Sequence, residues 1–504
     1  MSFAETPFGR AEDARAVIDI GSNTVRLVVY GAPVRAPTIL HNEKVTARLG
    51  KNLSRDGLLS EKGQASALAA LARYATLLKL AGVRDVTVAA TAATRDASNG
   101  PAFLEKVRET TGFSVRQLSG EEEALISARG VGAAFPGAKG IVADLGGGSL
   151  ELTAIDGADC THGLSLPLGT LRLPALRDKG GEAFRRKIGA MLDKAGWACE
   201  PGRRLYLVGG SLRAFARYAM IRMDWPVDDP HGFVLSPADA LEFTRTAVRR
   251  VPELPLDLPG ISASRVASLP DAAALLGVLV DRLAPAELVF SSWGLREGLL
   301  FENATADLLQ RNPLIAGAAD FATLRGIAPQ LATMVAGWTT AANDPNGASA
   351  EDLRLAATML ALASARVEPN LRPTQALEWA LRKRWIGIDD ASRAVLAAAV
   401  LANTGRLEAV PALTRLAPSA ALAEAQGWGL AIRLCRRFCA VTPQALARSS
   451  LVRSGGDLVL SVAAEYAPLV SDSLERDLKA LATHLELRPL VRVEDQPNPG
   501  RSST

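Results

Sequence analysis

Two segments of the chain carry an aspartate, a glycine turn and hydroxyl side chains in the same order. They lie within residues 17–30 and 141–155, with Asp19 and Asp144 at equivalent positions and an apolar run on each side of the turn. Glycine lets backbone N–H groups approach an anion, hydroxyls add donors, and the Asp can hold a cation directly or through water. The repeated pattern therefore predicts two hairpin loops that face each other and bind one phosphate-containing substrate.

A third glycine loop follows a predicted strand at 205–208 and opens a predicted helix, whose N-terminus would add exposed N–H groups and partial positive charge. A single glycine turn between strands is usually only a turn, so the prediction depends on the paired Asp–apolar–Gly arrangement. Three such loops favour a substrate with several phosphates. The expected phosphate-binding residues are Gly21, Ser22, Asn23, Thr24, Gly146, Gly147, Gly148, Ser149, Gly209, Gly210 and Ser211.

Acidic side chains near the loops could activate water. The triplet Glu121 to Glu123 opens a predicted helix, where the helix dipole alone also favours carboxylates. Glu151 lies two residues beyond Ser149 on the returning strand and would share its face. Crowded carboxylates would repel a phosphate unless a divalent cation intervened, which predicts Mg²⁺. Arg95, between a predicted strand and a predicted helix, could clamp phosphate oxygens or could be a surface side chain.

The elements that must position these residues alternate between strands and helices, which predicts α/β layers. Two units that begin alike predict a duplicated fold with a ligand cleft between its halves. The predicted strands are 38–49, 86–91, 114–118, 205–208 and 287–290, and the predicted helices are 60–81, 101–111, 121–131, 182–198, 212–223 and 271–283.

The composition changes near residue 312 to Ala- and Leu-rich helical segments, with one strand expected at 457–462. We therefore predict α/β domains at 1–130 and 131–306 and a mainly helical domain at 307–504. The polar tail from residue 496 is expected to be disordered.

Charge and cysteine content exclude several classes of protein. The 504 residues include 57 Lys and Arg against 53 Asp and Glu, and a formal charge of +4 gives no field suited to nucleic acid. Four scattered cysteines do not make a disulfide framework, and Cys435 and Cys439 are expected to be buried structural thiols. The start lacks an apolar signal core, and the apolar runs fall short of the ~18 residues that span a bilayer. We expect a soluble cytoplasmic protein with no membrane contact.

The ordered motifs resemble the exopolyphosphatase and guanosine pentaphosphate phosphatase family, within the larger group of actin, sugar kinases and heat-shock chaperone ATPases. The resemblance runs from Ile18 to Gly298 and implies duplicated actin-like (ribonuclease H-like) α/β domains around a cleft, followed by a mainly α-helical domain. The matching stretches are IDIGSNTVRLVVY (18–30), ATAATRDASN (90–99), LSGEEEA (118–124), VADLGGGSLEL (142–152), VGGS (208–211) and GLREG (294–298).

The resemblance also implies roles for individual residues. Glu123 would be the general base, Asp144 and Glu151 would assist the water and the metal, and Arg95 would clamp phosphate. Asp19 matches a position near the metal. The implied reaction is Mg²⁺-dependent removal of the terminal orthophosphate from inorganic polyphosphate, with guanosine pentaphosphate as the alternative substrate. Other divalent cations, activation by a monovalent ion and a homodimer are also expected.

One feature departs from the family. Long members often carry a helical domain resembling His-Asp metal phosphohydrolases, but of His41, His162, His231 and His484 only the last lies beyond residue 306. A second metal centre is therefore not expected there, and the domain would lengthen a substrate channel or form a dimer interface. Two other function classes stay open: a small-molecule kinase, which needs an acceptor alcohol, and a non-catalytic polyphosphate sensor, against which the retained carboxylates argue.

Overall fold

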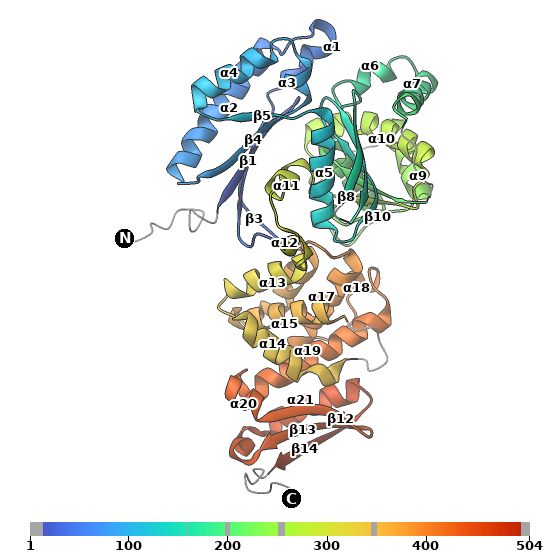
Figure 1. Ribbon diagram of the computed structural model, residues 1–504. Helices are drawn as coiled ribbons and strands as arrows, with labels where there is room; N and C mark the ends of the chain where they lie inside the picture. Colours follow the sequence, from blue (N-terminus) through green and yellow to red (C-terminus); the bar gives the residue numbers. More distant parts are fainter. Residues whose placement is uncertain (1–13, 158, 197–201, 250–257, 344–349, 495–504) are drawn as a thin grey trace, which may run out of the picture. The chain divides into compact units, whose positions relative to one another are not determined.

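The chain forms two units, residues 1–312 and 313–504, in a computed structural model that describes residues 14–157, 159–196, 202–249, 258–343 and 350–494 (Figure 1). Unit 1 contains two sheets, and unit 2 is mainly helical with one small sheet. Helix and strand alternate through unit 1, as the sequence predicts.

The two sheets of unit 1 share one strand pattern, in which an Asp-bearing hairpin occupies the centre and parallel strands extend one side. The duplicated fold predicted from the sequence is therefore confirmed. The first sheet has the order β3-β2-β1-β4-β5, with β1 Arg15–Ile20, β2 Val25–Gly31, β3 Thr38–Val45, β4 Asp85–Ala90 and β5 Val115–Gln117. The second has the order β10-β11-β9-β6-β7-β8, with β6 Lys139–Leu145, β7 Leu150–Asp156, β8 Asp159–Leu166, β9 Arg204–Val208, β10 Val234–Leu235 and β11 Glu287–Phe290.

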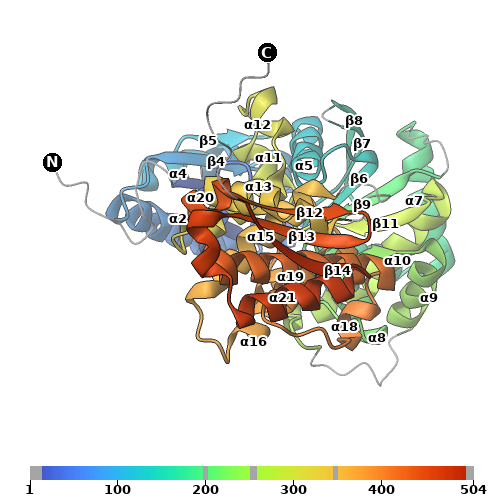
Figure 2. The ribbon, with the colours of Figure 1, turned by 90° about the horizontal axis from the view of Figure 1, so that it is seen from below.

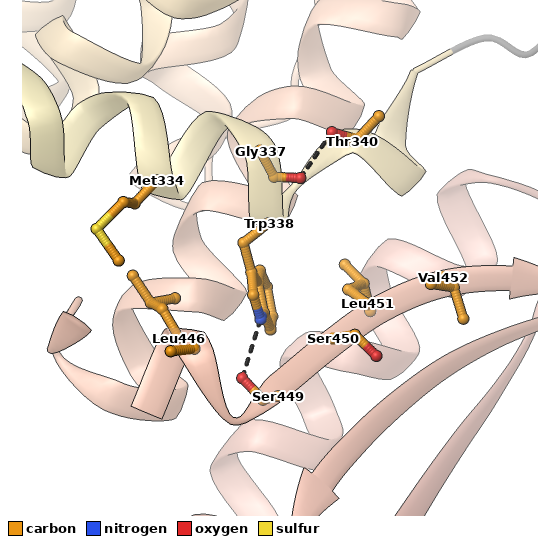
Figure 3. Close-up of a pocket in the computed structure, with 10 residues that line it drawn as sticks. Met334, Gly337, Trp338, Thr340, Leu446, Ser449, Ser450, Leu451 and Val452 are labelled. Atoms are coloured by element: carbon orange, nitrogen blue, oxygen red, sulfur yellow. Dashed lines mark hydrogen bonds between the residues drawn. The ribbon is translucent and has the colours of Figure 1, made fainter. Parts of the chain in front are cut away.

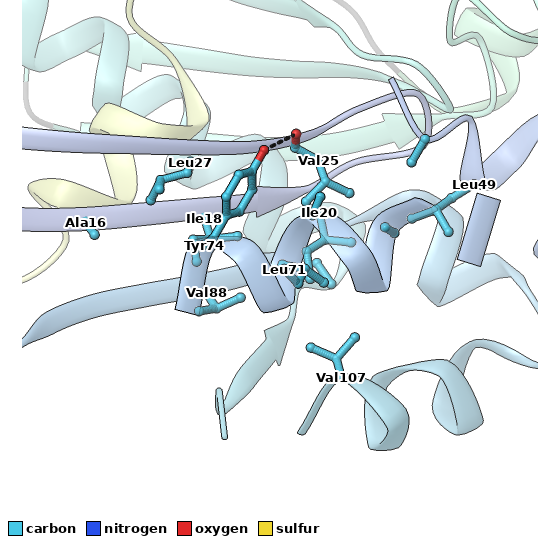
Figure 4. Packing of buried hydrophobic residues seen from close by; sticks show 14 of the residues in the cluster. Ala16, Ile18, Ile20, Val25, Leu27, Leu49, Leu71, Tyr74, Val88 and Val107 are labelled. Carbon is cyan, nitrogen blue, oxygen red and sulfur yellow. Dashed lines mark hydrogen bonds between the residues drawn. The ribbon is translucent and has the colours of Figure 1, made fainter. Parts of the chain in front are cut away.

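One face of the first sheet packs on helices α2 (Glu61–Leu80) and α4 (Gly100–Thr111). Ile18, Ile20 and Leu27 lie in this core with side chains of both helices (Figure 4). Tyr74 fills its centre, and its hydroxyl donates to the Val25 carbonyl oxygen at 3.3 Å, which satisfies the one polar group of a buried ring. This core fixes the hairpin that carries Asp19.

The other face of the first sheet packs on helices α5 (Gly120–Ala134) and α11 (Leu295–Leu300), with Ile126 and Leu299 in a shared core. The two helices approach so closely that a Cβ on Gly298 would lie 1.8 Å from the Ile126 carbonyl oxygen. Helix α5 also contacts β7 and β8 of the second sheet. The helix that begins with the Glu triplet is therefore held between the two halves of unit 1.

Helix α10 (Ala263–Leu283) is the one described helix whose length and composition would let it cross a membrane. More than half of its most apolar window is buried inside the unit, where it packs against α8 (Gly210–Arg222) and α9 (Pro237–Val248). One such helix is weak evidence for a span, because the core helix of a globular unit meets the same criteria. The other described helices of unit 1 include α3 (Ala92–Asp96), α6 (Leu173–Arg177) and α7 (Gly181–Lys194).

Unit 2 packs its helices around α17 (Asp390–Asn403) and α19 (Ser419–Cys439), with α13 (Pro313–Thr323), α14 (Pro329–Trp338) and α15 (Glu351–Ala363) beside them. The strand predicted at 457–462 is confirmed as the central strand β13 (Asp457–Ala463) of a three-stranded sheet. Figure 2 shows β12 (Ser449–Ser454), β13 and β14 (Arg488–Glu494) side by side, with α21 (Asp472–His484) against them.

The cysteine prediction holds where the structure describes the residues. Cys435 and Cys439 are buried free thiols, and Cys160 is half-buried. Cys199 and the tail predicted to be disordered lie outside the described residues.

Candidate active site

The two hairpin loops of unit 1 touch each other. A Cβ added to Gly147 would lie 3.2 Å from both the Cβ and the backbone nitrogen of Asn23, and one added to Gly148 would lie 2.5 Å from Ser22 Oγ. Any other residue at Gly148 would displace the Ser22 hydroxyl. Glycine at these positions therefore serves close approach between the loops, as well as turn formation.

The loops are built alike. The Gly21 amide donates to the Thr24 carbonyl oxygen and the Gly146 amide to that of Ser149, both at 3.0 Å. Ser22 is 4% exposed, and within the described part of the chain its hydroxyl has no hydrogen-bond partner. A buried hydroxyl without a partner costs free energy, so a ligand oxygen at this point would satisfy it.

The third predicted loop lies against the end of β6. Gly209 has φ +110°, and a Cβ there would lie 2.3 Å from the Leu145 carbonyl oxygen, so packing alone requires glycine. Ser211 Oγ lies 3.2 Å from Ser268 Oγ, and the Gly210 Cα faces the guanidinium of Arg265. A phosphate contact by Gly209, Gly210 or Ser211 stays a prediction.

Asp144 and Glu151 are direct cross-strand partners in the β6–β7 hairpin. Asp144 Oδ2 accepts a hydrogen bond from Ser127 of α5 at 2.5 Å, and Glu151 Oε1 accepts one from Ser165 of β8 at 2.8 Å. Burial raises the pKa of both carboxyls, and the charges of Glu123 and Asp144 raise the pKa of Glu151 further. The structure thus brings two carboxyl groups together where the sequence predicts a cation.

Glu123 differs from its neighbours in the acidic triplet. Glu122 completes a capping box with Ser119 and remains exposed, so the helix terminus accounts for it. Glu123 is 8% exposed, and its Oε2 lies 3.1 Å from an Arg95 nitrogen. Burial raises the pKa of Glu123 to about 7, the Arg95 charge opposes this, and the charges of Asp144 and Asp19 add to it. A carboxylate with this pKa is suited to accept a proton near neutral pH.

Arg95 is half-buried, and hydrogen bonds hold its guanidinium in place. Its NH1 group donates to the Leu118 carbonyl oxygen at 3.0 Å as well as to Glu123. The sequence leaves two interpretations of Arg95, a phosphate clamp and a surface side chain. The surface interpretation does not describe this environment, because the guanidinium faces the proposed base.

Asp19 Oδ2 lies 3.5 Å from Arg296 NH1, and Arg296 belongs to the GLREG stretch at the start of α11. Burial raises the pKa of Asp19, while the positive charges of Arg296 and Arg26 oppose that rise. Asp19 also contributes to the raised pKa of Asp144, so the two halves bring their aspartates into electrostatic contact. A role for Asp19 beside a metal stays a prediction.

Several basic side chains near the loops were missed at the sequence level. Burial lowers the pKa of Lys44, and the nearby charges of Arg265, Arg26 and Arg213 lower it further. One pattern could have revealed Arg26: it follows Asp19 by seven residues, as Glu151 follows Asp144. The duplicated hairpins therefore place a cation in one half where the other half has a carboxylate.

The donor set fits Mg²⁺ in the form this ion usually adopts. Mg²⁺ keeps several waters and binds through one or two carboxylates plus substrate phosphates. Asp144 and Glu151 supply two adjacent carboxylates with raised pKa values, which a divalent cation would stabilise in their charged forms. No group of three or more His, Cys, Asp or Glu side chains that could hold a metal ion is found among the described residues.

A cavity of about 420 Å³ lies elsewhere, in unit 2 (Figure 3). Met334, Trp338, Leu446 and Val452 line it, and the Trp338 indole nitrogen donates to Ser449 Oγ at 3.0 Å. None of its lining residues belongs to the glycine loops or the carboxylates. Its mainly apolar walls do not suit a chain of phosphates.

Comparison with known proteins identifies the families that this chain matches. Residues 27–306 match the Ppx/GppA phosphatase family, and residues 314–488 match the family described as exopolyphosphatase, C-terminal. Proteins named exopolyphosphatase 1 from Mycobacterium bovis and Mycobacterium tuberculosis are 26% identical over 306 residues, which is 58% of this chain and 88% of theirs.

Solved structures share the fold over more than half of this chain. A Ppx/GppA family member from Aquifex aeolicus has a TM-score of 0.51 and 24% identity, covering 57% of this chain and 97% of its own. An exopolyphosphatase from Cytophaga hutchinsonii has a TM-score of 0.52 and 23% identity, with the same coverage of both chains. Together with the family match over more than half of the sequence, these likenesses assign the fold. The chain belongs to the Ppx/GppA phosphatase family.

Proposed function

We propose that this phosphatase is an exopolyphosphatase, which removes the terminal orthophosphate from inorganic polyphosphate with the help of Mg²⁺. The contact between the two glycine loops beside the buried carboxylate of Glu123 carries the proposal. Loops of this kind present N–H groups and hydroxyls to phosphate oxygens, and a carboxylate whose pKa is about 7 can take a proton from water.

In the proposed reaction, the end of the phosphate chain lies against both loops, at 21–24 and 146–149, beside the point where they touch. Their backbone N–H groups, the Ser22 hydroxyl and Arg95 stabilise charge on the equatorial oxygens, which is the larger part of catalysis in phosphoryl transfer. Glu123 takes the proton of the water that attacks in line with the leaving phosphate. Mg²⁺ bound by Asp144 and Glu151 would offset the charge that these carboxylates and the substrate bring together.

Guanosine pentaphosphate is the alternative substrate, because it also presents a terminal phosphoanhydride. The basic side chains of Arg26, Lys44, Arg213 and Arg265 would favour an extended anion in either case. They give no reason to prefer a nucleotide over a phosphate chain.

The experiment compares orthophosphate release, with Mg²⁺ present, from long polyphosphate, defined short polyphosphates and guanosine pentaphosphate. The proposal predicts the highest kcat/KM for a polyphosphate and a loss of about 10²- to 10⁴-fold in Glu123→Gln. A higher kcat/KM for guanosine pentaphosphate would overturn the substrate assignment. Phosphate release that depends on an added acceptor alcohol would instead identify a kinase.

A further inference from the structure

The turn at Gly169–Arg172 is built onto the second glycine loop. The Thr170 amide donates to the Gly146 carbonyl oxygen at 3.0 Å, and the Leu171 amide donates to that of Gly147 at 2.9 Å. A Cβ on Gly169 would lie 2.3 Å from the carbonyl carbon of Gly148, so the backbones are in direct contact. The position of Arg172 is therefore set by the loop expected to hold phosphate.

The side chain of Arg172 reaches from this loop into the other half of unit 1. Its NH2 group donates to Asp96 Oδ2 at 2.8 Å, and Asp96 is the last residue of α3, which follows β4 of the first sheet. Asp96 Oδ1 lies 3.6 Å from Arg95 Nε, and Arg95 NH1 lies 3.1 Å from Glu123 Oε2. Charges of alternating sign thus run from the second loop to the proposed base.

The chain of charges is partly shielded from solvent. The side chains of Arg172, Arg95 and Glu123 are 22%, 24% and 11% exposed, and that of Asp96 is 37% exposed. Ion pairs with this degree of burial are screened less than fully exposed pairs, so each link influences the next. Asp96 is the central link in this chain of charges, because it contacts Arg172 from one half of unit 1 and Arg95 from the other.

We propose that Arg172 is a positioning residue for the hydrolysis, acting through Asp96 to hold Arg95 where its guanidinium contacts Glu123 in the free protein and the terminal phosphate in the complex. The inference rests on the proposed function. Arrival of the phosphate then gives Arg95 a second anionic partner and leaves the Glu123 carboxylate freer to bind the attacking water. Only a substrate that contacts both loops would complete this exchange. The contact of Arg172 with Asp96 links the position of the second glycine loop to the position of Arg95 in the other half.

The test is a double-mutant cycle on the full chain, with kcat and KM for phosphate release measured for Arg172→Met, Asp96→Asn and the double variant. We expect each single change to lower kcat by about 10- to 100-fold, as misplacement of a catalytic group by about 1 Å does. The double variant should be no slower than the slower single variant, because Asp96→Asn already breaks the link that Arg172→Met removes. Arg172→Lys should recover part of kcat.

The ion pair between Arg177 and Asp271 offers a matched control. Its side chains are 25% and 15% exposed, and both lie in the second half of unit 1. Arg177→Met should keep kcat within about twofold of the wild type, even if its unfolding temperature falls as far as that of Arg172→Met. If Arg172→Met does not fold, Asp96→Asn and Arg172→Lys carry the same comparison.

Unchanged kcat in Arg172→Met, strictly additive losses in the cycle, or an equal loss of kcat in Arg177→Met would each overturn the inference. Failure of the proposed function has a different signature. The wild-type protein would then release no orthophosphate from polyphosphate. The unfolding temperatures of the wild type, the Arg172→Met and Asp96→Asn variants and the double variant would still show whether Arg172 and Asp96 are coupled.

Discussion

Replacing Glu123 by Gln should stabilise the protein at pH 8 while it removes most of the turnover. Glu123 is 8% exposed, and its pKa is about 7 against an ordinary value of 4.5, chiefly because burial disfavours the charged form. A carboxyl with a raised pKa binds more protons in the folded state than in the unfolded state. The free energy of unfolding therefore falls as the pH rises from 4.5 to about 7.

The size of the effect follows from the two pKa values. At 1.36 kcal/mol per pH unit, the difference between 4.5 and about 7 costs the folded wild-type protein about 3 kcal/mol at pH 8. At pH 5 the native carboxyl is mostly protonated and the cost falls below about 1 kcal/mol. Glutamine carries no charge at either pH, so the Glu123→Gln variant does not lose this free energy of unfolding.

The assay is thermal unfolding of both proteins at several pH values between 5 and 8, together with phosphate release at pH 8. Glu122→Gln is the neighbouring control: hydrogen bonds from the Ser119 backbone and Arg116 lower the pKa of Glu122, so this change should cost less than about 1 kcal/mol and leave turnover intact. The reasoning is refuted if Glu123→Gln unfolds at or below the wild-type temperature at pH 8. A difference that does not shrink towards pH 5 would refute it equally.

Three further outcomes are expected. Gly148→Ala should lower kcat/KM by at least about 10-fold without unfolding the protein, because the new Cβ would lie 2.5 Å from Ser22 Oγ and displace this hydroxyl from the proposed phosphate site; kinetics and circular dichroism check this. Gly298→Ala should cost about 3 kcal/mol of stability, because its Cβ would lie 1.8 Å from a backbone oxygen of α5; an unchanged denaturant midpoint would argue against this packing. Removal of divalent cations by a chelator should abolish phosphate release and excess Mg²⁺ should restore it; full activity in the chelator would contradict the assigned role of Asp144 and Glu151.

Much of unit 1 could be predicted because its patterns are local. The two hairpins are apolar strands around glycine turns, and helix α2 begins after Ser60, whose side chain accepts a hydrogen bond from the Gly63 amide. Strand β8 was missed, because its sequence DCTHGLSL has weak alternation and only its pairing with β7 defines it. Strands β12 and β14 were missed for a similar reason, since their side chains are largely exposed.

The candidate site was harder to predict in full, because its electrostatics come from residues distant in sequence. The sequence does not show that Arg95 faces Glu123 or that Arg296 faces Asp19, since 28 and 277 positions separate the partners. Arg172 carried no motif of its own, and its contact with Asp96 depends on how a turn of one half sits on a glycine loop. The carboxylates themselves were identifiable: Asp19 and Asp144 repeat at one spacing from the glycine turns, Glu151 follows Ser149 by two residues, and Glu123 lies in an acidic triplet.

The most direct test of the central claim is hydrolysis of polyphosphate in ¹⁸O-labelled water, followed by mass analysis of the released orthophosphate. If Glu123 directs water onto the terminal phosphate bound by the two loops, each orthophosphate released in a single cleavage carries one ¹⁸O atom, and Glu123→Gln releases almost none. Orthophosphate without ¹⁸O, or labelled product formed at an equal rate by Glu123→Gln, would contradict the account.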